Sequence, residues 1–77
     1  MVRAADPAGV RVRIRVNGED HELPGGTTVT DLLVRLQIVA ERVAVERNRL
    51  VVRRGTYAET RLEDGDELEI LTFVGGG

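Results

Sequence analysis

Apolar and arginine side chains alternate without interruption between residues 10 and 16, and this pattern constrains the fold more than any other feature of the chain. The apolar members are Val10, Val12, Ile14 and Val16. Strict alternation is typical of a strand with one buried and one solvated face. Asn17-Gly18 follows at once and favours a type I′ turn, in which both central residues need positive φ. The sequence therefore predicts a hairpin whose return strand covers residues 19–23.

A single helix is predicted over about residues 29–37. Pro24-Gly25-Gly26 ends the return strand, because proline cannot donate to the ladder and the glycines let the chain cross over. Thr28 and Asp31 have the spacing of a capping box, in a variant with a carboxylate at its second position. Apolar residues then recur at helical spacing, at Val29, Leu32, Leu33 and Leu36. This side of the helix must pack on the sheet.

Three more strands are predicted in the second half of the chain, at about residues 43–47, 50–52 and 67–73. Asn48-Arg49 joins the first two as a turn, and Glu63-Asp64-Gly65-Asp66 forms a tight turn before the last. We expect Tyr57 to lie in a short turn with its ring against the edge of the domain. Arg53-Arg54 is interpreted as a solvated corner, with docking to an acidic partner as the alternative.

The order of hairpin, helix and three strands predicts an α+β fold of the β-grasp type, in which a mixed sheet of four to five strands packs on one helix. We expect residues 1–9 to be a flexible leader, residues 10–73 the folded domain and residues 74–77 a flexible tail. Folds of this kind support many functions, so topology alone assigns none.

The two faces of the last strand differ in their side chains. Leu68 and Ile70 share one face, and the other face begins with glutamates and ends with Leu71 and Phe73. If Leu68 and Ile70 point to the helix, then Leu71 and Phe73 are exposed beside Val74, and an exposed apolar cluster commonly marks a partner-binding surface. The alternative is that a late twist of the strand buries Phe73 in the core.

The sequence ends with Gly75-Gly76-Gly77. Glycine has no Cβ to bury and loses much backbone entropy when ordered, so this run favours a mobile strip that can thread a narrow channel of another protein. Chemistry at the terminal carboxyl group of Gly77 would then meet no side chain. The alternative is ordinary fraying of a chain end.

Composition excludes several classes of function. The chain has no Cys, Ser or Lys, which removes thiol, serine and Schiff-base nucleophiles. We expect no metal site, because the lone His21, expected to be exposed, cannot complete a zinc site and residues 63–66 lack the EF-hand spacing. A net charge of −2 and few aromatic residues argue against nucleic-acid binding. No apolar run approaches the about 20 residues that span a membrane, so we expect a soluble cytoplasmic protein.

Several segments together resemble one known family. They are Val16-Asn17-Gly18, Pro24-Gly25-Gly26-Thr27-Thr28-Val29, Val43-Ala44-Val45-Glu46 with Asn48, Tyr57-Ala58-Glu59-Thr60, Asp64-Gly65-Asp66 and Val74-Gly75-Gly76-Gly77. In this order and spacing, from about Val10 to Gly77, they resemble the thiamine-biosynthesis sulfur carriers of the ubiquitin-like superfamily. The chain departs from the family pattern at Arg49 in place of a turn glycine, at Arg53 in place of a proline and at Tyr57 in place of a tryptophan.

The resemblance implies a mechanism in which the chain is a protein co-substrate and not an enzyme. An E1-like adenylating enzyme would use ATP and magnesium to activate the carboxylate of Gly77, and a sulfur donor such as a cysteine desulfurase relay would convert it to a thiocarboxylate. The carrier would then deliver sulfur to thiazole synthase. Gly75 and Gly76 would thread the partner's active site, and Leu71, Phe73 and Val74 would seat the tail.

Other functions remain open at this point. The small subunit of molybdopterin synthase is a related carrier with the same ending, and carriers for amino-acid, tRNA or secondary-metabolite pathways share the plan. A protein modifier that forms isopeptide bonds through Gly77, or a passive interaction module, is also compatible with the sequence.

Overall fold

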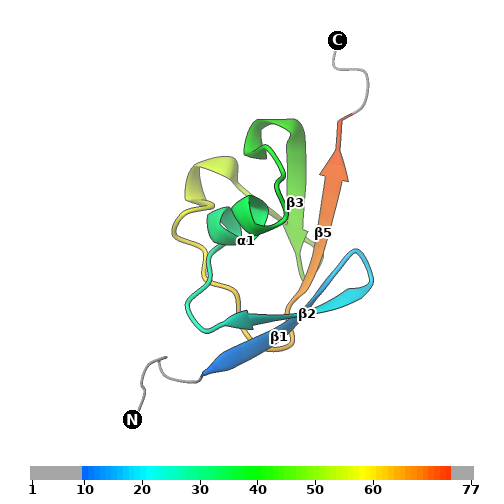
Figure 1. Ribbon diagram of the computed structural model, residues 1–77. Helices are drawn as coiled ribbons and strands as arrows, with labels where there is room; N and C mark the ends of the chain where they lie inside the picture. The colour runs from blue at the N-terminus through cyan, green and yellow to red at the C-terminus, as the bar shows by residue number, and fades with distance from the viewer. Residues whose placement is uncertain (1–9, 74–77) are drawn as a thin grey trace.

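The computed structural model describes residues 10–73, which form a five-stranded sheet with one α-helix against it (Figure 1). The strands are β1 Arg11–Val16, β2 Glu19–Pro24, β3 Val43–Arg47, β4 Leu50–Val52 and β5 Glu67–Thr72, and the helix is α1 Val29–Arg35. The sheet order is β2-β1-β5-β3-β4. The central pair β1 and β5 is parallel and the other neighbours are antiparallel. This mixed sheet on one helix confirms the predicted α+β, β-grasp architecture.

The helix α1 begins where the capping box places it. The Asp31 amide donates to Thr28 Oγ1, and the Thr28 amide donates to Asp31 Oδ2, each over 3.1 Å. The helix ends at Arg35, earlier than the predicted residue 37, because Gln37 takes a positive φ of 59°. Leu36 is only partly buried and packs at the margin of the core.

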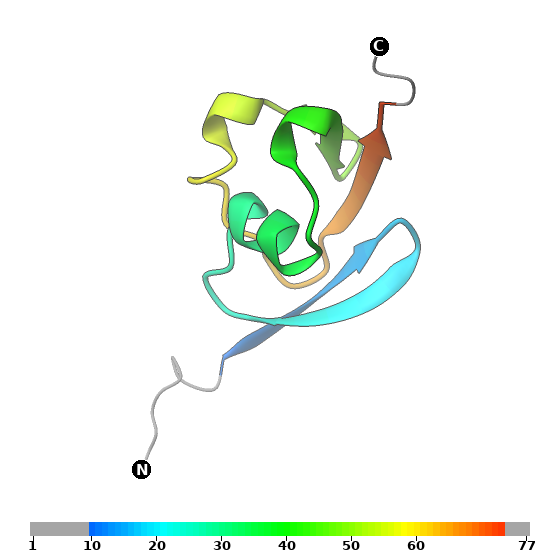
Figure 2. The same ribbon diagram turned by 45° about the horizontal axis from the view of Figure 1, so that its top comes forward.

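The core lies between the sheet and α1, and Figure 2 shows these two elements in a second view of the ribbon. Alternate residues of β1 are buried, as the sequence pattern predicts. The buried apolar residues are Val12, Ile14, Val16, Leu23, Val29, Leu32, Leu33, Val43, Val45, Tyr57, Leu62, Leu68 and Ile70. The opposite face of the sheet has no covering layer within residues 10–73.

The long connections contain two short 3-10 helices, η1 Ala40–Arg42 and η2 Arg54–Thr56, that the sequence pattern does not predict. The second one corrects the prediction for Tyr57, whose ring is buried in the core and not placed at the domain edge. The loop is drawn inward because the Thr30 amide at the start of α1 donates to the Tyr57 carbonyl over 3.2 Å. Arg53 and Arg54 are exposed, as expected for a solvated corner.

His21 is half-buried, whereas the sequence interpretation expects it to be exposed. It pairs in register with the buried Ile14, so its side chain lies on the helix side of the sheet. Among residues 10–73 no helix is long and apolar enough to cross a bilayer.

Candidate functional site

The end of β5 and the uncovered face of the sheet form the candidate functional site. Leu68 and Ile70 are buried toward α1, whereas Leu71 is 47% exposed and Phe73 is 59% exposed. The predicted division of the two faces is confirmed, and the alternative with Phe73 buried in the core is wrong. The Phe73 amide donates to the Arg42 carbonyl over 3.0 Å, which holds the chain against the neighbouring segment up to this residue. Val74, Gly75, Gly76 and Gly77 lie outside the described residues.

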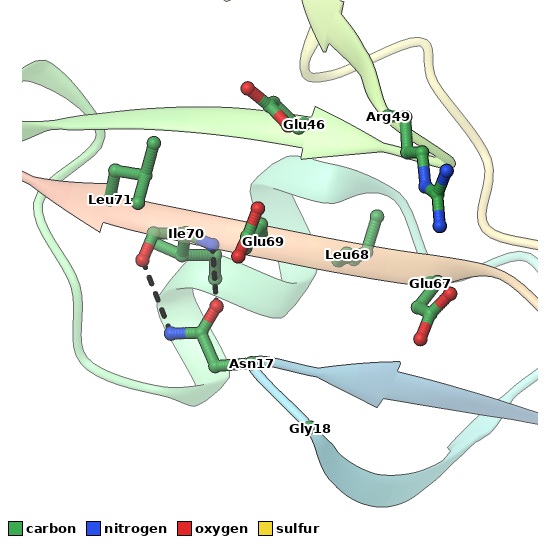
Figure 3. A pocket seen from close by; sticks show the side chains of 9 residues that line it. All are labelled: Asn17, Gly18, Glu46, Arg49, Glu67, Leu68, Glu69, Ile70 and Leu71. Carbon is green, nitrogen blue, oxygen red and sulfur yellow. Dashed lines mark hydrogen bonds between the residues drawn. The ribbon is translucent and has the colours of Figure 1, made fainter.

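Asn17 in the β1–β2 turn binds the backbone of β5 through its side chain (Figure 3). The Ile70 amide donates to Asn17 Oδ1 over 2.8 Å, and Asn17 Nδ2 donates to the Ile70 carbonyl over 3.2 Å. β1 ends before it reaches Ile70, because the chain turns away at Asn17. The Asn17 side-chain amide therefore makes the hydrogen bonds to Ile70 that a further residue of β1 would make. This exchange steadies β5 immediately before the exposed Leu71.

Asn48 in the β3–β4 turn binds the start of β5 from the other side. The Glu67 amide donates to Asn48 Oδ1 over 3.0 Å, and the Asn48 amide donates to the Glu67 carbonyl over 2.7 Å. Asn48 Nδ2 donates to Asp66 Oδ1 over 3.1 Å. Asparagine side chains from opposite neighbours in the sheet thus bind β5 at its first residue, Glu67, and at Ile70 in its second half.

Asp66 is the buried anchor of this second turn and is only 6% exposed. Its Oδ2 accepts from Arg47 Nε over 2.9 Å and from the Glu63 amide over 2.8 Å. Every polar side-chain atom that is fully buried within residues 10–73 has a hydrogen-bond partner. Of the three carboxylates in the predicted Glu63–Asp66 turn, Asp66 is therefore buried and structural, whereas Glu63 and Asp64 are exposed.

An open hollow with a volume of about 370 Å³ lies on the uncovered face, alongside β5. It is lined by Asn17, Gly18, Glu46, Arg49, Glu67, Leu68, Glu69, Ile70 and Leu71, which Figure 3 shows from close by. Glu46 and Glu69 are directly opposite in the β3–β5 register, and like charges in such a pair repel each other. The hollow leads along β5 to the apolar end with Leu71.

The site combines an ordered strand with an apolar surface and a charged hollow. Within residues 10–73 no three His, Cys, Asp or Glu side chains group as they would around a metal ion. The chain lacks Cys, Ser and Lys nucleophiles. What the geometry supplies is a strand bound by asparagine side chains at Glu67 and Ile70, exposed Leu71 and Phe73 at its end and a charged hollow beside it.

The sequence interpretation identifies Leu71 and Phe73 but misses the roles of Asn17, Asn48 and Asp66. Asn17 and Asn48 are expected only as turn residues, because asparagine tolerates positive φ. Their second role depends on β5, which is distant in the chain. One signal in the sequence could have indicated this role. Both turns have asparagine as their first residue, although other residues can also form such turns.

Comparison with known proteins places the chain in a family. The ThiS family model matches residues 14–77. The sulfur carrier protein ThiS of Bacillus subtilis is 40% identical over 65 residues, which cover 83% of this chain and 98% of that protein. A crystal structure of the thiamine biosynthesis protein ThiS from Geobacter metallireducens superposes with a TM-score of 0.71 at 39% identity, and covers 86% of this chain and 100% of that one.

A longer relative shows the same domain in a larger protein. A thiazole synthase of Magnetococcus marinus is 47% identical over 66 residues, which make up 86% of this chain. The matched segment spans only 20% of the length of that relative. With the family match, the sequence identities and the superposed fold in agreement, the chain belongs to the ThiS family.

Proposed function

We propose that this chain is a sulfur carrier of thiamine biosynthesis and that it holds sulfur as a thiocarboxylate on Gly77. The observation that carries the proposal is the family match, which runs through residue 77 and so includes the whole glycine run. The Bacillus subtilis sulfur carrier supports it, since nearly all of that protein is covered.

The first chemical step is activation of the carboxyl group. A carboxylate is a poor electrophile, so one of its oxygens must become part of a good leaving group. An E1-like adenylating enzyme with bound ATP and magnesium would let a Gly77 carboxylate oxygen attack the α-phosphorus, which releases pyrophosphate and leaves an acyl adenylate. No side chain of this chain is required for that step.

The second step replaces AMP by sulfur. The sulfur of a donor, such as a persulfide supplied by a cysteine desulfurase, attacks the carbonyl carbon and displaces AMP. The resulting acyl disulfide is cleaved by a thiol, which is oxidised, and the thiocarboxylate is released. Thiazole synthase is the proposed acceptor, and the occurrence of a similar segment within a longer thiazole synthase supports that pairing.

The geometry of the fold suits such a carrier. Gly75 and Gly76 would enter the partner's active site, because a strip without side chains passes a narrow channel. Leu71 and Phe73 are exposed where β5 ends and would pack against the partner with Val74. The clamps of Asn17 and Asn48 on β5 hold this surface in a fixed position relative to the domain.

Intact-mass analysis tests the proposal. The purified chain is incubated with the adenylating enzyme, ATP, magnesium and a sulfur source, and the expected product has one oxygen exchanged for sulfur at Gly77. A chain that lacks Gly76 and Gly77 is the matched control, which should fold normally and gain no sulfur. A native protein whose mass shows that it continues beyond Gly77 without being trimmed would contradict the proposal.

Transfer assays test the finer assignment. Sulfur-loaded chain should support thiazole formation by thiazole synthase. Delivery to a molybdopterin precursor instead would assign it to the other branch of carriers. Recovery of Gly77 joined to lysines of other proteins would favour a protein modifier.

A further inference from the structure

The edge strand β4 carries a second surface that the proposed function does not use. Its Leu50 is 73% exposed and Val51 is 70% exposed. Four arginines lie between residues 47 and 54, and no carboxylate occurs from residue 47 to residue 58. The segment is therefore both apolar and basic in a chain whose net charge is −2.

Three of these arginines have no ion-pair partner among residues 10–73. Arg47 is engaged by Asp66 and Glu63. Arg49, Arg53 and Arg54 are exposed and make no ion pair there, although Arg54 donates to the Val43 carbonyl over 3.4 Å. On β1, two of the three arginines, Arg11 and Arg15, each face a carboxylate of β2. Arg49 shares the hollow beside β5 with Glu46, Glu67 and Glu69, whereas Arg53 and Arg54 do not line it.

The backbone of β4 is open on one side. The strand pairs with β3 and lies at the end of the sheet. The two-residue Asn48-Arg49 turn makes Arg47 and Leu50 the hydrogen-bonded closing pair, so the next pair, Glu46 and Val51, does not exchange bonds. The N–H and C=O groups of Val51 therefore point to the open edge, where an added strand would bind them.

The apolar side chains identify the kind of occupant. Leu50 and Val51 are neighbours in an extended strand, so they lie on opposite faces of the sheet. A flat surface covers only one face, whereas an extended segment that runs along the edge places alternate side chains beside both. The segment must be short, because the Arg53 carbonyl already accepts from the Thr56 amide over 2.8 Å and the chain turns away at η2.

We propose that the open edge of β4 binds a short extended segment of a partner protein, with apolar residues at its centre and Asp or Glu at its ends. The carboxylates would pair with Arg53 and Arg54 on one side and Arg49 on the other. Main-chain bonds to Val51 give the affinity and the charges select the partner. β3 separates β4 from β5, and of these three arginines only Arg49 also lines the hollow beside β5.

A second copy of the chain does not fit this edge. In an antiparallel pair of β4 strands centred on Val51, Arg49 of each chain would lie opposite Arg53 of the other, and such like charges repel. Nucleic acid fits less well, because the edge offers no aromatic ring for stacking: Tyr57 is buried in the core.

A titration with synthetic peptides tests the proposal. The probe is a peptide with a Val-Ile-Val centre and glutamates at both ends, added to the full chain while the backbone amide resonances are recorded. We expect the Val51 amide to shift. A peptide with lysines in place of the glutamates, and one with an N-methylated centre that cannot form a strand, should not bind.

Charge reversal separates docking from folding. The double variant Arg53→Glu, Arg54→Glu should weaken binding of the acidic peptide by about tenfold or more, since attraction is replaced by repulsion. Arg61→Glu, at another exposed arginine, is the matched control and should leave binding unchanged. Sulfur loading of Gly77 should be equal in all three proteins.

Several outcomes would overturn the proposal. These are equal binding of the lysine peptide, undiminished binding by the double variant when its unfolding midpoint is unchanged, and absence of any shift at Val51. Stronger binding of a single-stranded oligonucleotide than of the acidic peptide would assign the arginines to phosphate recognition instead.

Discussion

The β1–β2 turn and the β3–β4 turn use the same residue for the same purpose but are anchored differently. Asn17 and Asn48 have φ of 51° and 52°, and each exchanges hydrogen bonds with the backbone of β5. Behind Asn48 lies the buried carboxylate of Asp66 with its own bonds to Arg47 and Glu63. Asn17 bonds only with the neutral backbone of Ile70 through its side chain.

The turns also differ at their second residue. Gly18 has φ of 87°, which glycine adopts without strain, whereas Arg49 has φ of 73° and carries a Cβ. The start of β5 is therefore tied to a charged buried network that can offset a strained turn. The second half of β5, next to Leu71, is held at Ile70 by neutral hydrogen bonds from Asn17, and the turn that carries Asn17 has glycine at its second residue. Four substitutions test this difference.

Removal of the buried anchor should have the largest effect. Asp66→Ala deletes the acceptor of Arg47, Asn48 and the Glu63 amide, so we expect the free energy of unfolding to fall by about 3 kcal/mol. Chemical denaturation measures this loss. Asp64→Ala is the matched control, because Asp64 is an exposed carboxylate of the same turn with one bond, to the Arg13 amide. Equal losses for the two variants would show that Asp66 stabilises the fold no more than the exposed Asp64 does.

Asn48→Asp should have the next largest effect, about 2 kcal/mol, because it places a second carboxylate against Asp66. The substitution preserves side-chain shape and tolerance of positive φ. The loss of stability therefore measures the contact with Asp66 and not a change in the turn. Thermal unfolding and the protection of the Glu67 amide from hydrogen exchange measure it. A stability equal to the parent chain would show that the Asn48–Asp66 contact has no energetic weight.

The same change at the other turn should cost less. Asn17→Asp keeps the acceptor for the Ile70 amide but places an oxygen against the Ile70 carbonyl, with an expected loss of about 1 kcal/mol. Hydrogen exchange should accelerate at Ile70 and leave Glu67 unchanged. If Asn17→Asp proves as damaging as Asn48→Asp, the two turns are equivalent and the comparison fails.

The smallest expected effect is a gain. Arg49→Gly should raise the free energy of unfolding by about 0.5 kcal/mol, because glycine relieves the cost of a positive φ although it adds entropy to the unfolded chain. Denaturation midpoints measure the change. Gly18→Ala is the complementary control. It should be destabilising because its φ of 87° is strained for alanine, and a steric clash is not the cause, since a Cβ at this position meets no atom within 4 Å.

Local patterns predicted most of the fold, because the pattern that indicates each helix or strand lies within a few consecutive residues. The alternation of β1, the Thr28–Asp31 cap of α1 and the asparagine turns all depend on neighbours in the chain. Tyr57 and His21 were predicted incorrectly, since their burial depends on a loop that bonds to α1 and on the register with Ile14. The role of Gly77 remains a prediction, because the described residues end before it.

By itself the sequence determined the hairpin, the capped helix, the buried face of each strand and the apolar exit of β5, because side-chain period and turn chemistry are local. Only the tertiary structure decided that β5 lies between β1 and β3, and hence that two asparagines far apart in the chain hold it from both sides. It also left β4 at an open edge, and the flanking Arg49, Arg53 and Arg54 make no ion pair among the described residues. Pairing of strands joins segments that the chain separates, and no short-range pattern encodes which neighbours will meet.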